Sequence, residues 1–348
     1  MITTLVTFLL LLVEAGASQT VCVTGAGGYV ATELVKQLLE NGFHVKGTVR
    51  SLKQKDKYAH LEKLDAALPG TLKLLEADLL KPNSFDACAE GSKYVFHTAS
   101  PFHFEAANTL KDMIEPARNG TENVLKSAIK AKAERVIVTS SFAASNSFLP
   151  DDKPDSGTLY SEEDWNDFID ESVWKDNKQQ AYIASKSLAE RKAWELGKSH
   201  GIDVVVIQPV LVMGPVHAPR VEGVSVGTMK SIIEGSPLPF AFPWCDNRDV
   251  AKAHIQAAVN PTASGRYIVA QPNTIPHSYV YEVLSKGLPQ FAWAKPEKEE
   301  AQNPMIDNAK IKGLIGGLYP LESTILDMAR SLISANLATP KLNPKTEL

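Results

Sequence analysis

The chain has 348 residues, of which 44% are hydrophobic and 22% charged, and its net charge is −4. This composition is typical of a globular protein with one large domain and a smaller lobe, and the near-neutral charge gives no electrostatic reason to expect nucleic acid as a partner. The three cysteines, Cys22, Cys88 and Cys245, are widely spaced and lack metal-ligand spacing, so we expect neither a disulfide framework nor a metal site.

The first segment of the chain, residues 5–13, is almost entirely apolar but too short to span a bilayer as a helix. Residues 15–17 then resemble a signal-peptidase site, although residues 1–4 contain no Lys or Arg, so a signal peptide and an apolar arm are equal alternatives. The terminal KTEL is one residue away from the KDEL retrieval signal. The glycosylation sequon at Asn119 falls within a predicted helix, where a glycan fits poorly. We therefore expect a cytoplasmic protein without a membrane span, with the endoplasmic reticulum lumen or secretion as the alternative.

From about residue 20, short apolar runs that read as strands alternate with segments that read as helices. The expected strands are residues 21–23, 45–49, 71–75, 94–97, 136–139 and 204–207. The expected helices between them are residues 32–39, 58–68, 107–131 and 182–196. Strands that alternate with helical connections in this way predict an α/β fold with a doubly wound parallel sheet of the Rossmann type.

A glycine-rich stretch, TGAGGYVA at residues 24–31, lies between the first strand and the first helix. Gly25 permits a tight turn, and Gly28 lets the backbone approach a pyrophosphate bound at the helix N-terminus. Ala31 stands where a third glycine often does, and it is small enough for the helix to pack closely on the strand. Because strand, spacing and helix agree, we predict a dinucleotide site here rather than an ordinary glycine turn.

The end of the second strand is basic. NAD enzymes usually place a carboxylate there for the ribose 2′-hydroxyl, whereas this chain has Arg50, followed by Lys53, Lys55 and Lys57. A carboxylate would repel a 2′-phosphate, and a guanidinium binds it with two hydrogen bonds. The pattern favours NADP(H) over NAD, although a solvated basic stretch would also explain the lysines.

Tyr182 and Lys186 are four residues apart on a predicted helix and therefore share one face. A free phenol has a pKa of about 10, and a neighbouring ammonium favours the phenolate. Ser141 follows the strand at 136–139, where its hydroxyl can orient a substrate carbonyl. A Tyr-x-x-x-Lys pair is common by chance. Together with the strand-end serine and the dinucleotide motif, it predicts the catalytic set Ser141, Tyr182 and Lys186.

After Pro209 the rhythm breaks, which predicts a smaller C-terminal lobe that includes the amphipathic segment 321–337. One helix (248–259) and one strand (266–269) are expected to return to the sheet. The acidic insertion at 146–178 is either solvated decoration or part of a substrate cleft. The predicted domains are a signal peptide or apolar arm at 1–17, an NADP-binding Rossmann domain at 18–208 that 248–270 rejoins, and a substrate-binding lobe at 209–247 and 271–340.

With these motifs the chain resembles the extended short-chain dehydrogenases/reductases, in particular the branch of dihydroflavonol reductases, cinnamoyl-CoA reductases and microbial aldehyde/ketone reductases. The resemblance covers about residues 20–335. It is carried by the stretches VCVTGAGGYVA, GTVRS, EADL, VFHTASP, NGTENVL, VTSSFAA, YIASK, QPVLVMGP and RDVAKAH. It implies reduction of an aldehyde or ketone to an alcohol with NADP(H), a small-molecule carbonyl substrate, and a monomer or homodimer.

The resemblance also implies a role for individual residues. Those assigned to the cofactor are Gly25, Gly28, Tyr29 and Val30 at the pyrophosphate, Arg50 and Lys57 at the 2′-phosphate, Asp78 and Leu79 beside the adenine, Thr98, Ala99 and Ser100 along the cofactor, and Pro209, Val210, Leu211 and Val212 at the nicotinamide. Tyr182 is the proton donor, Lys186 binds the ribose and lowers the pKa of Tyr182, and Ser141 positions the carbonyl. Asn119 is structural, and the pair Arg248-Asp249 links the lobe to the sheet.

Two departures bear on the substrate. Gln208 stands where the branch usually has Asn, and residues 179–184 lack the aromatic side chains of cinnamoyl-CoA reductases, which leaves a general aldehyde or ketone reductase. A 3β-hydroxysteroid dehydrogenase-like enzyme shares the motifs and is an alternative. A nucleotide-sugar epimerase or dehydratase is disfavoured by Arg50 and by Phe142 after the catalytic serine. A non-catalytic NADP-sensing regulator would lack the Tyr–Lys pair.

Overall fold

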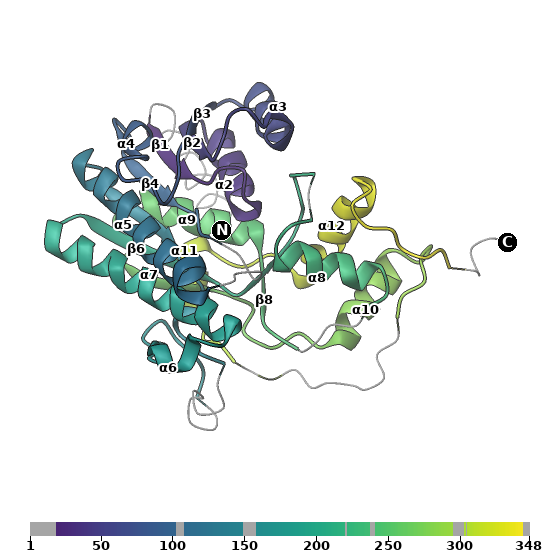
Figure 1. Ribbon diagram of the computed structural model, residues 1–348. Helices are drawn as coiled ribbons and strands as arrows, with labels where there is room; N and C mark the ends of the chain where they lie inside the picture. Colours follow the sequence, from purple (N-terminus) through teal and green to yellow (C-terminus); the bar gives the residue numbers. More distant parts are fainter. Residues whose placement is uncertain are drawn as a thin grey trace.

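A seven-stranded sheet forms the centre of the protein in the computed structural model, which describes residues 19–101, 108–148, 158–219, 221–236, 241–294, 303 and 305–343 (Figure 1). Every neighbouring pair of strands is parallel. In order across the sheet the strands are β3 (Thr71–Glu76), β2 (His44–Val49), β1 (Thr20–Thr24), β4 (Tyr94–His97), β5 (Arg135–Thr139), β6 (Asp203–Pro209) and β9 (Gly265–Val269). The predicted α/β fold with a Rossmann-type sheet is confirmed, and its chain order reverses between β1 and β4.

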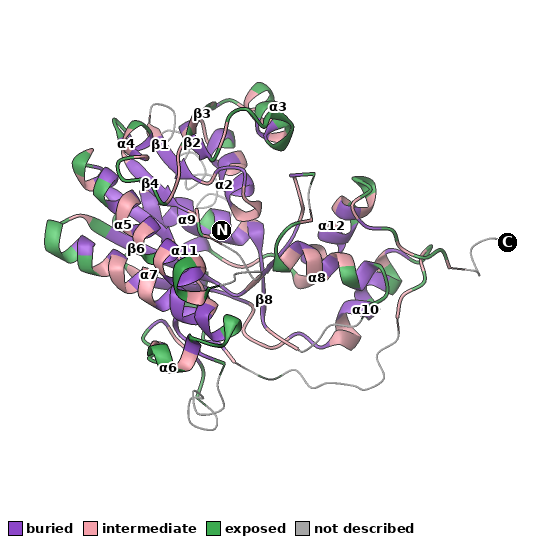
Figure 2. Cartoon of the chain, in the orientation of Figure 1, coloured by how far each residue is buried: buried purple, intermediate pink, exposed green. Residues whose placement is uncertain are grey.

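Helices cover both faces of this sheet, which is why its strands read as continuous apolar runs. Within β6, Val205 and Ile207 pack toward α2 (Tyr29–Glu40), α9 (Asn247–Val259) and α11 (Ala309–Ile315). The alternate residues Val204 and Val206 pack on the other face, toward α4 (Asp86–Ala89), α5 (Glu115–Lys130) and α7 (Lys178–His200). Figure 2 shows the resulting buried layer through the sheet. Shorter elements complete this part, namely η1 (Lys55–Lys57), α3 (Ala59–Ala67), η3 (Phe142–Ala144) and α6 (Glu171–Trp174).

The helix predicted at 107–131 is interrupted. Residues Leu110–Ile114 form a π-helical turn, η2, and the regular helix α5 begins at Glu115. Pro116 follows at once, and because proline has no N–H it cannot continue the preceding hydrogen-bond ladder. Asn119 lies within α5, as expected. Residue 107 and the predicted features at 1–17, at 149–157 of the acidic insertion and at the terminal KTEL lie outside the described residues.

The smaller lobe holds a two-stranded parallel sheet, β7 (Leu211–Met213) and β8 (Trp244–Asp246). Three helices pack beside it, α8 (Val224–Ile233), α10 (His277–Gly287) and α12 (Leu321–Ser334), and they lie together to one side of the large sheet (Figure 1). Its core includes Met229, Trp244 and Met328. No helix in the part of the chain that the structure describes is long and apolar enough to cross a membrane.

Charged side chains at the start of α9 join the lobe to the sheet. Arg248 forms ion pairs with Asp246 at 2.7 Å and with Asp327 of α12 at 2.8 Å, and its guanidinium lies over the ring of Tyr319. Asp249 accepts a hydrogen bond from the backbone N–H of Tyr319 at 2.9 Å. The contact expected of Arg248-Asp249 is therefore present, with partners in the C-terminal segment.

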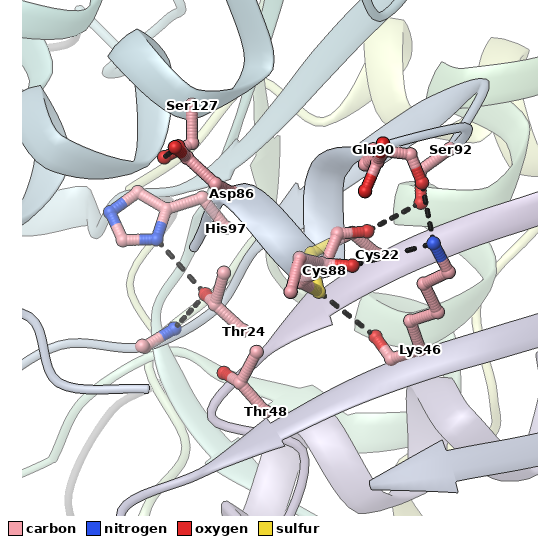
Figure 3. The surroundings of a disulfide bond; sticks show 12 residues. Cys22, Thr24, Lys46, Thr48, Asp86, Cys88, Glu90, Ser92, His97 and Ser127 are labelled. Carbon is pink, nitrogen blue, oxygen red and sulfur yellow. Dashed lines mark hydrogen bonds between the residues drawn. A yellow bond between two sulfur atoms is a disulfide. The ribbon is translucent and has the colours of Figure 1, made fainter. Parts of the chain in front are cut away.

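The expectation that the cysteines form no disulfide is wrong. Cys22 in β1 and Cys88 in α4 are both buried and are joined by a disulfide, with their Cα atoms 5.3 Å apart (Figure 3). They are separated by 66 residues in the chain, so their spacing gives no sign of pairing. The crossover that places α4 against β1 brings them together. Cys245 is buried and unpaired.

Reducing this disulfide is expected to lower the free energy of unfolding by about 2–4 kcal/mol, because the bond restricts the unfolded chain by closing a long loop. The measurement is urea unfolding of the wild type with and without dithiothreitol. The C22A/C88A double variant is the control, since its unfolding midpoint should be independent of the reductant. A wild-type unfolding midpoint that is the same with and without dithiothreitol would contradict the expectation.

Candidate active site

The glycine-rich loop joins the end of β1 to the start of α2, at the edge of the sheet where β1 and β4 end. Gly25 has φ +66°, and a Cβ there would lie 3.1 Å from the Cα of Ala99, so the close approach of the two loops requires glycine. Gly28 is the N-cap residue of α2, and no side chain caps that helix. The loop therefore leaves backbone N–H groups at a helix N-terminus, an arrangement that fits a pyrophosphate. Tyr29 donates its hydroxyl hydrogen to the carbonyl oxygen of Gly214 at 2.8 Å, which ties this turn to the lobe.

A buried histidine, His97, holds the ends of β1 and β4 together (Figure 3). The backbone N–H of Ala99 donates to Thr24 Oγ1 at 3.0 Å, and Thr24 Oγ1 lies 3.1 Å from His97 Nδ1. Thr121 Oγ1 lies 3.2 Å from His97 Nε2, so both ring nitrogens of His97 are hydrogen-bonded to threonine hydroxyls. Burial, with a smaller effect from the charge of Lys186, lowers the pKa of His97 to about 3. His97 is thus a neutral structural link between the strands.

The predicted 2′-phosphate and adenine residues lie along the edge formed by β2 and β3. Arg50 follows β2, Lys57 is the last residue of η1, and both side chains are exposed. Within the described ranges neither of them forms an ion pair. Asp78 accepts from the backbone N–H of Leu80 at 3.0 Å. Leu79 packs over Gly120 of α5, where a Cβ would lie 3.0 Å from Leu79 Cδ2. These positions fit a cofactor that carries a 2′-phosphate.

The three predicted catalytic residues are brought together at the ends of β4 and β5. Ser141 follows β5, and its hydroxyl lies close enough to that of Tyr182 to influence the pKa of the phenol. Tyr182 and Lys186 share one face of α7, with Lys186 Nζ 5.3 Å from the centre of the tyrosine ring. Lys186 also donates to Ser100 Oγ at 2.8 Å, so the strand-end segment assigned to the cofactor touches the catalytic lysine. At the start of α7, the Asn177 side chain accepts from two backbone N–H groups and fixes the first turn.

The direction of the tyrosine pKa differs from the expectation. Burial raises the pKa of Tyr182, and its hydrogen bond with Ser141 offsets part of that rise. Burial also lowers the pKa of the Lys186 ammonium to about 8. Sequence spacing showed that the two groups share a face, but it could not show that both are removed from water. The consequence is a phenol that stays protonated near neutral pH and so suits the role of an acid.

The residues predicted at the nicotinamide lie where β6 leads into β7. Pro209 ends β6 and Leu211 begins β7, and the backbone N–H of Val210 donates to the carbonyl oxygen of Val269 at 3.4 Å. Pro209, Val210 and Val212 are buried and Leu211 is half-buried. This segment is thus a largely buried connection between the sheet and the lobe rather than a set of exposed side chains.

Aromatic side chains gather beside the catalytic serine. Phe142 follows Ser141 and contacts Tyr160 at a ring-centre distance of 5.3 Å, and Phe148 contacts Phe242 of the lobe at 5.4 Å. Phe148 has φ +58° and is 39% exposed, an unusual combination for a large apolar residue. This aromatic cluster lies between the sheet and the lobe.

Sequence reasoning missed one buried acidic residue of the site. Glu190 lies four residues after Lys186 on α7, and the two line a small cavity of about 20 Å³ together with Ser100 and Ser140. Its spacing from Lys186 was the available signal, because residues four apart on a helix share a face.

The chain is similar to known proteins of one family, in sequence and in structure. A model of the NAD dependent epimerase/dehydratase family matches residues 21–270. The cinnamoyl-CoA reductase CAD2 of Medicago truncatula is 38% identical over 324 residues, which cover 90% of this chain and 95% of that protein. The anthocyanidin reductase of Vitis vinifera is 36% identical over 291 residues, or 78% and 82% of the two chains. The structure of yeast methylglyoxal/isovaleraldehyde reductase Gre2 complexed with NADPH has a TM-score of 0.79 and 28% identity, and the match covers 92% of this chain and all of that one.

Proposed function

Because the chain belongs to the NAD dependent epimerase/dehydratase family, and within it to the branch of cinnamoyl-CoA and anthocyanidin reductases, we propose that it reduces an aldehyde or ketone to an alcohol with NADPH. The observation that carries the proposal is the meeting of three groups, with Ser141 beside the Tyr182 hydroxyl and Lys186 Nζ 5.3 Å from the centre of the Tyr182 ring. We assign cofactor binding to residues 18–208 and 248–270, and substrate binding to 209–247 and 271–340.

In this mechanism the substrate carbonyl oxygen accepts hydrogen bonds from Ser141 and Tyr182. The bound cofactor supplies a hydride for the carbonyl carbon. As negative charge develops on the oxygen, the Ser141 hydroxyl stabilises it. Tyr182 then donates its proton, and this transfer is downhill because an alkoxide is a stronger base than a phenolate. The Lys186 ammonium stabilises the phenolate that remains and binds the cofactor ribose.

The protonation state of Tyr182 suits it to donate a proton in carbonyl reduction. Burial raises the pKa of Tyr182, so the phenol holds its proton at neutral pH. The protonated Tyr182 phenol beside Ser141 can therefore donate its proton to the oxygen of a carbonyl that is being reduced.

The choice of NADPH over NADH is assigned to Arg50. Arg50→Asp removes a charge-assisted contact and adds repulsion, so NADPH affinity should fall by about 10- to 100-fold, from about 1.5–3 kcal/mol for such a contact. NADH affinity should stay the same or rise. The measurement is fluorescence titration with each cofactor. Lys53→Asp makes the same charge change at a neighbouring exposed residue and should have a much smaller effect. An equal loss in both variants would place the 2′-phosphate elsewhere.

The substrate class is tested by following NADPH oxidation with a panel of aromatic and aliphatic aldehydes, ketones, flavanonols and 3-ketosteroids. The exposed ring of Phe148, which contacts Phe142 and Phe242, supports an apolar carbonyl compound. We expect turnover with at least one aldehyde or ketone. Absence of NADPH oxidation across the panel would contradict the proposed function.

The disulfide bears on the compartment. Structural disulfides persist in oxidising compartments and are rare in the cytosol. The Cys22–Cys88 bond therefore supports the secretory alternative over the cytoplasmic expectation. N-terminal sequencing of protein from its own cells tests this, since a start at Ser18 is expected. A chain that begins at Met1 and carries three free thiols would support the cytoplasm.

A further inference from the structure

The carboxylate of Glu190 is completely buried in α7, two helical turns after Tyr182. Its Oε2 accepts from Ser140 Oγ at 2.5 Å and from Gln208 Nε2 at 3.0 Å. Its Oε1 accepts from Arg266 Nε at 2.7 Å and from Trp194 Nε1 at 3.3 Å. A buried carboxylate is tolerated only when its charge is compensated, and here four donors converge on it.

Arg266 of β9 provides the compensating charge, with a side chain that is 7% exposed. The rest of its guanidinium donates to the carbonyl oxygens of Glu162, Asp164 and Ala144, and it stacks on the ring of Trp165 at 3.9 Å. The ion pair therefore joins α7 to β9, to the loop at 162–165 and to η3, which directly follows Ser141.

Gln208, which departs from the usual Asn of the branch, is part of the same cluster. Its amide nitrogen donates to Glu190, and its Oε1 accepts from Ser145 Oγ at 3.2 Å. The side chain thus spans from α7 to the turn after η3. Gln208 also precedes Pro209, the first residue assigned to the nicotinamide.

We propose that Glu190 is a positioning residue that sets the distance between Ser141 and Tyr182 by binding the end of β5 to the catalytic helix. This inference rests on the proposed function. The link is direct, because Ser140 is the residue before Ser141 and Glu190 is on the helix that carries Tyr182 and Lys186. Gln208 and Arg266 hold the carboxylate in place from β6 and β9.

Distances within a catalytic set are sensitive to such links. A shift of about 1 Å between reacting groups can cost about 10²-fold in rate. Loss of one hydrogen bond to Glu190 leaves its charge paired with Arg266 and leaves the backbone N–H of Ser140 bonded to the carbonyl oxygen of Ile207 at 2.8 Å. The fold is therefore preserved, and what is lost is the side-chain link between Ser140 and α7. Ser140→Ala is therefore a sharper variant than Glu190→Gln, which also breaks a buried ion pair and endangers folding.

The test compares Ser140→Ala with Trp194→Phe. Both remove one donor to the same carboxylate, but Trp194 is on α7 itself and links it to no strand. Ser140→Ala should lower kcat about tenfold, with NADPH affinity near wild type. Its urea midpoint should fall, as should that of Trp194→Phe, because each variant loses one donor to the buried carboxylate. Trp194→Phe should leave kcat unchanged. Ser140→Thr should restore kcat, because it keeps the hydroxyl and the adjoining cavity has room for a methyl group.

Hydrogen exchange gives a readout that does not depend on turnover. Amides of residues 141–146 should exchange faster in Ser140→Ala and, where it folds, in Glu190→Gln, but not in Trp194→Phe. Wild-type kcat in Ser140→Ala, or equal losses of kcat in Ser140→Ala and Trp194→Phe, would overturn the inference. If the wild type reduces no carbonyl compound, the proposed function fails. Unchanged exchange in Ser140→Ala would refute the link itself.

Discussion

Tyr182→Phe is expected to lower turnover by about 10²- to 10⁴-fold while NADPH binds as in the wild type, because a positioned proton donor contributes that much. The substitution deletes one oxygen and keeps the ring, so the packing of α7 is retained. Ser141 loses its interaction with the Tyr182 hydroxyl but keeps its own hydroxyl for the substrate carbonyl. The measurements are kcat on the best substrate of the panel and fluorescence titration with NADPH.

Tyr281→Phe is the matched control for this experiment. It also deletes a hydroxyl that makes a hydrogen bond, to the carbonyl oxygen of Ser236, but within the lobe. Its turnover should remain at the wild-type level. Wild-type turnover in Tyr182→Phe would show that the proton comes from another group, and the glycine motif would then indicate nucleotide binding alone.

Lys186→Met should impair both catalysis and cofactor binding. The variant keeps the volume of a buried side chain but removes the ammonium that is assigned to the ribose and the phenolate. We expect NADPH affinity to fall by about 10- to 100-fold, equivalent to about 1.5–3 kcal/mol, and turnover to fall by at least 10²-fold. Lys192→Met, on the outer part of α7 in an ion pair with Glu195, is the control and should retain both properties.

The pH dependence of binding separates this role of Lys186 from a packing role. Burial lowers its pKa to about 8, so the ammonium is present below that pH and is lost above it. Wild-type NADPH affinity should therefore decline as the pH rises through about 8, whereas the affinity of Lys186→Met should stay flat over that range. A parallel decline in both proteins would assign the effect to another group.

The fold was readable from the sequence because its strands are buried on both faces. Runs such as Val204 to Ile207 are apolar throughout. Because they alternate with amphipathic helices, they predict a parallel sheet that helices cover on both faces. The juxtaposition of Tyr182, Lys186 and Ser141 was predictable for a related reason. Helical spacing places the first two on one face, and residues at the ends of parallel strands share one edge of the sheet.

Other features depend on contacts between distant segments. Cys22 and Cys88 meet because a crossover stacks α4 on β1, and no spacing rule shows that pairing. The rise in the pKa of Tyr182 follows from burial in the folded chain. Gln208 is visible in the sequence as a departure from the branch, but its role depends on Glu190, a residue 18 positions earlier to which its side chain is hydrogen-bonded.

Transfer of deuterium from NADPH labelled at nicotinamide C4 tests the central claim most directly. The protein is incubated with the labelled cofactor, in each C4 epimer, and with the best carbonyl substrate, and the alcohol is analysed by mass spectrometry and NMR. The account predicts deuterium on the carbinol carbon from one epimer of NADPH, with loss of product in Tyr182→Phe. An alcohol without deuterium from either epimer, or no alcohol from any carbonyl compound, would contradict it.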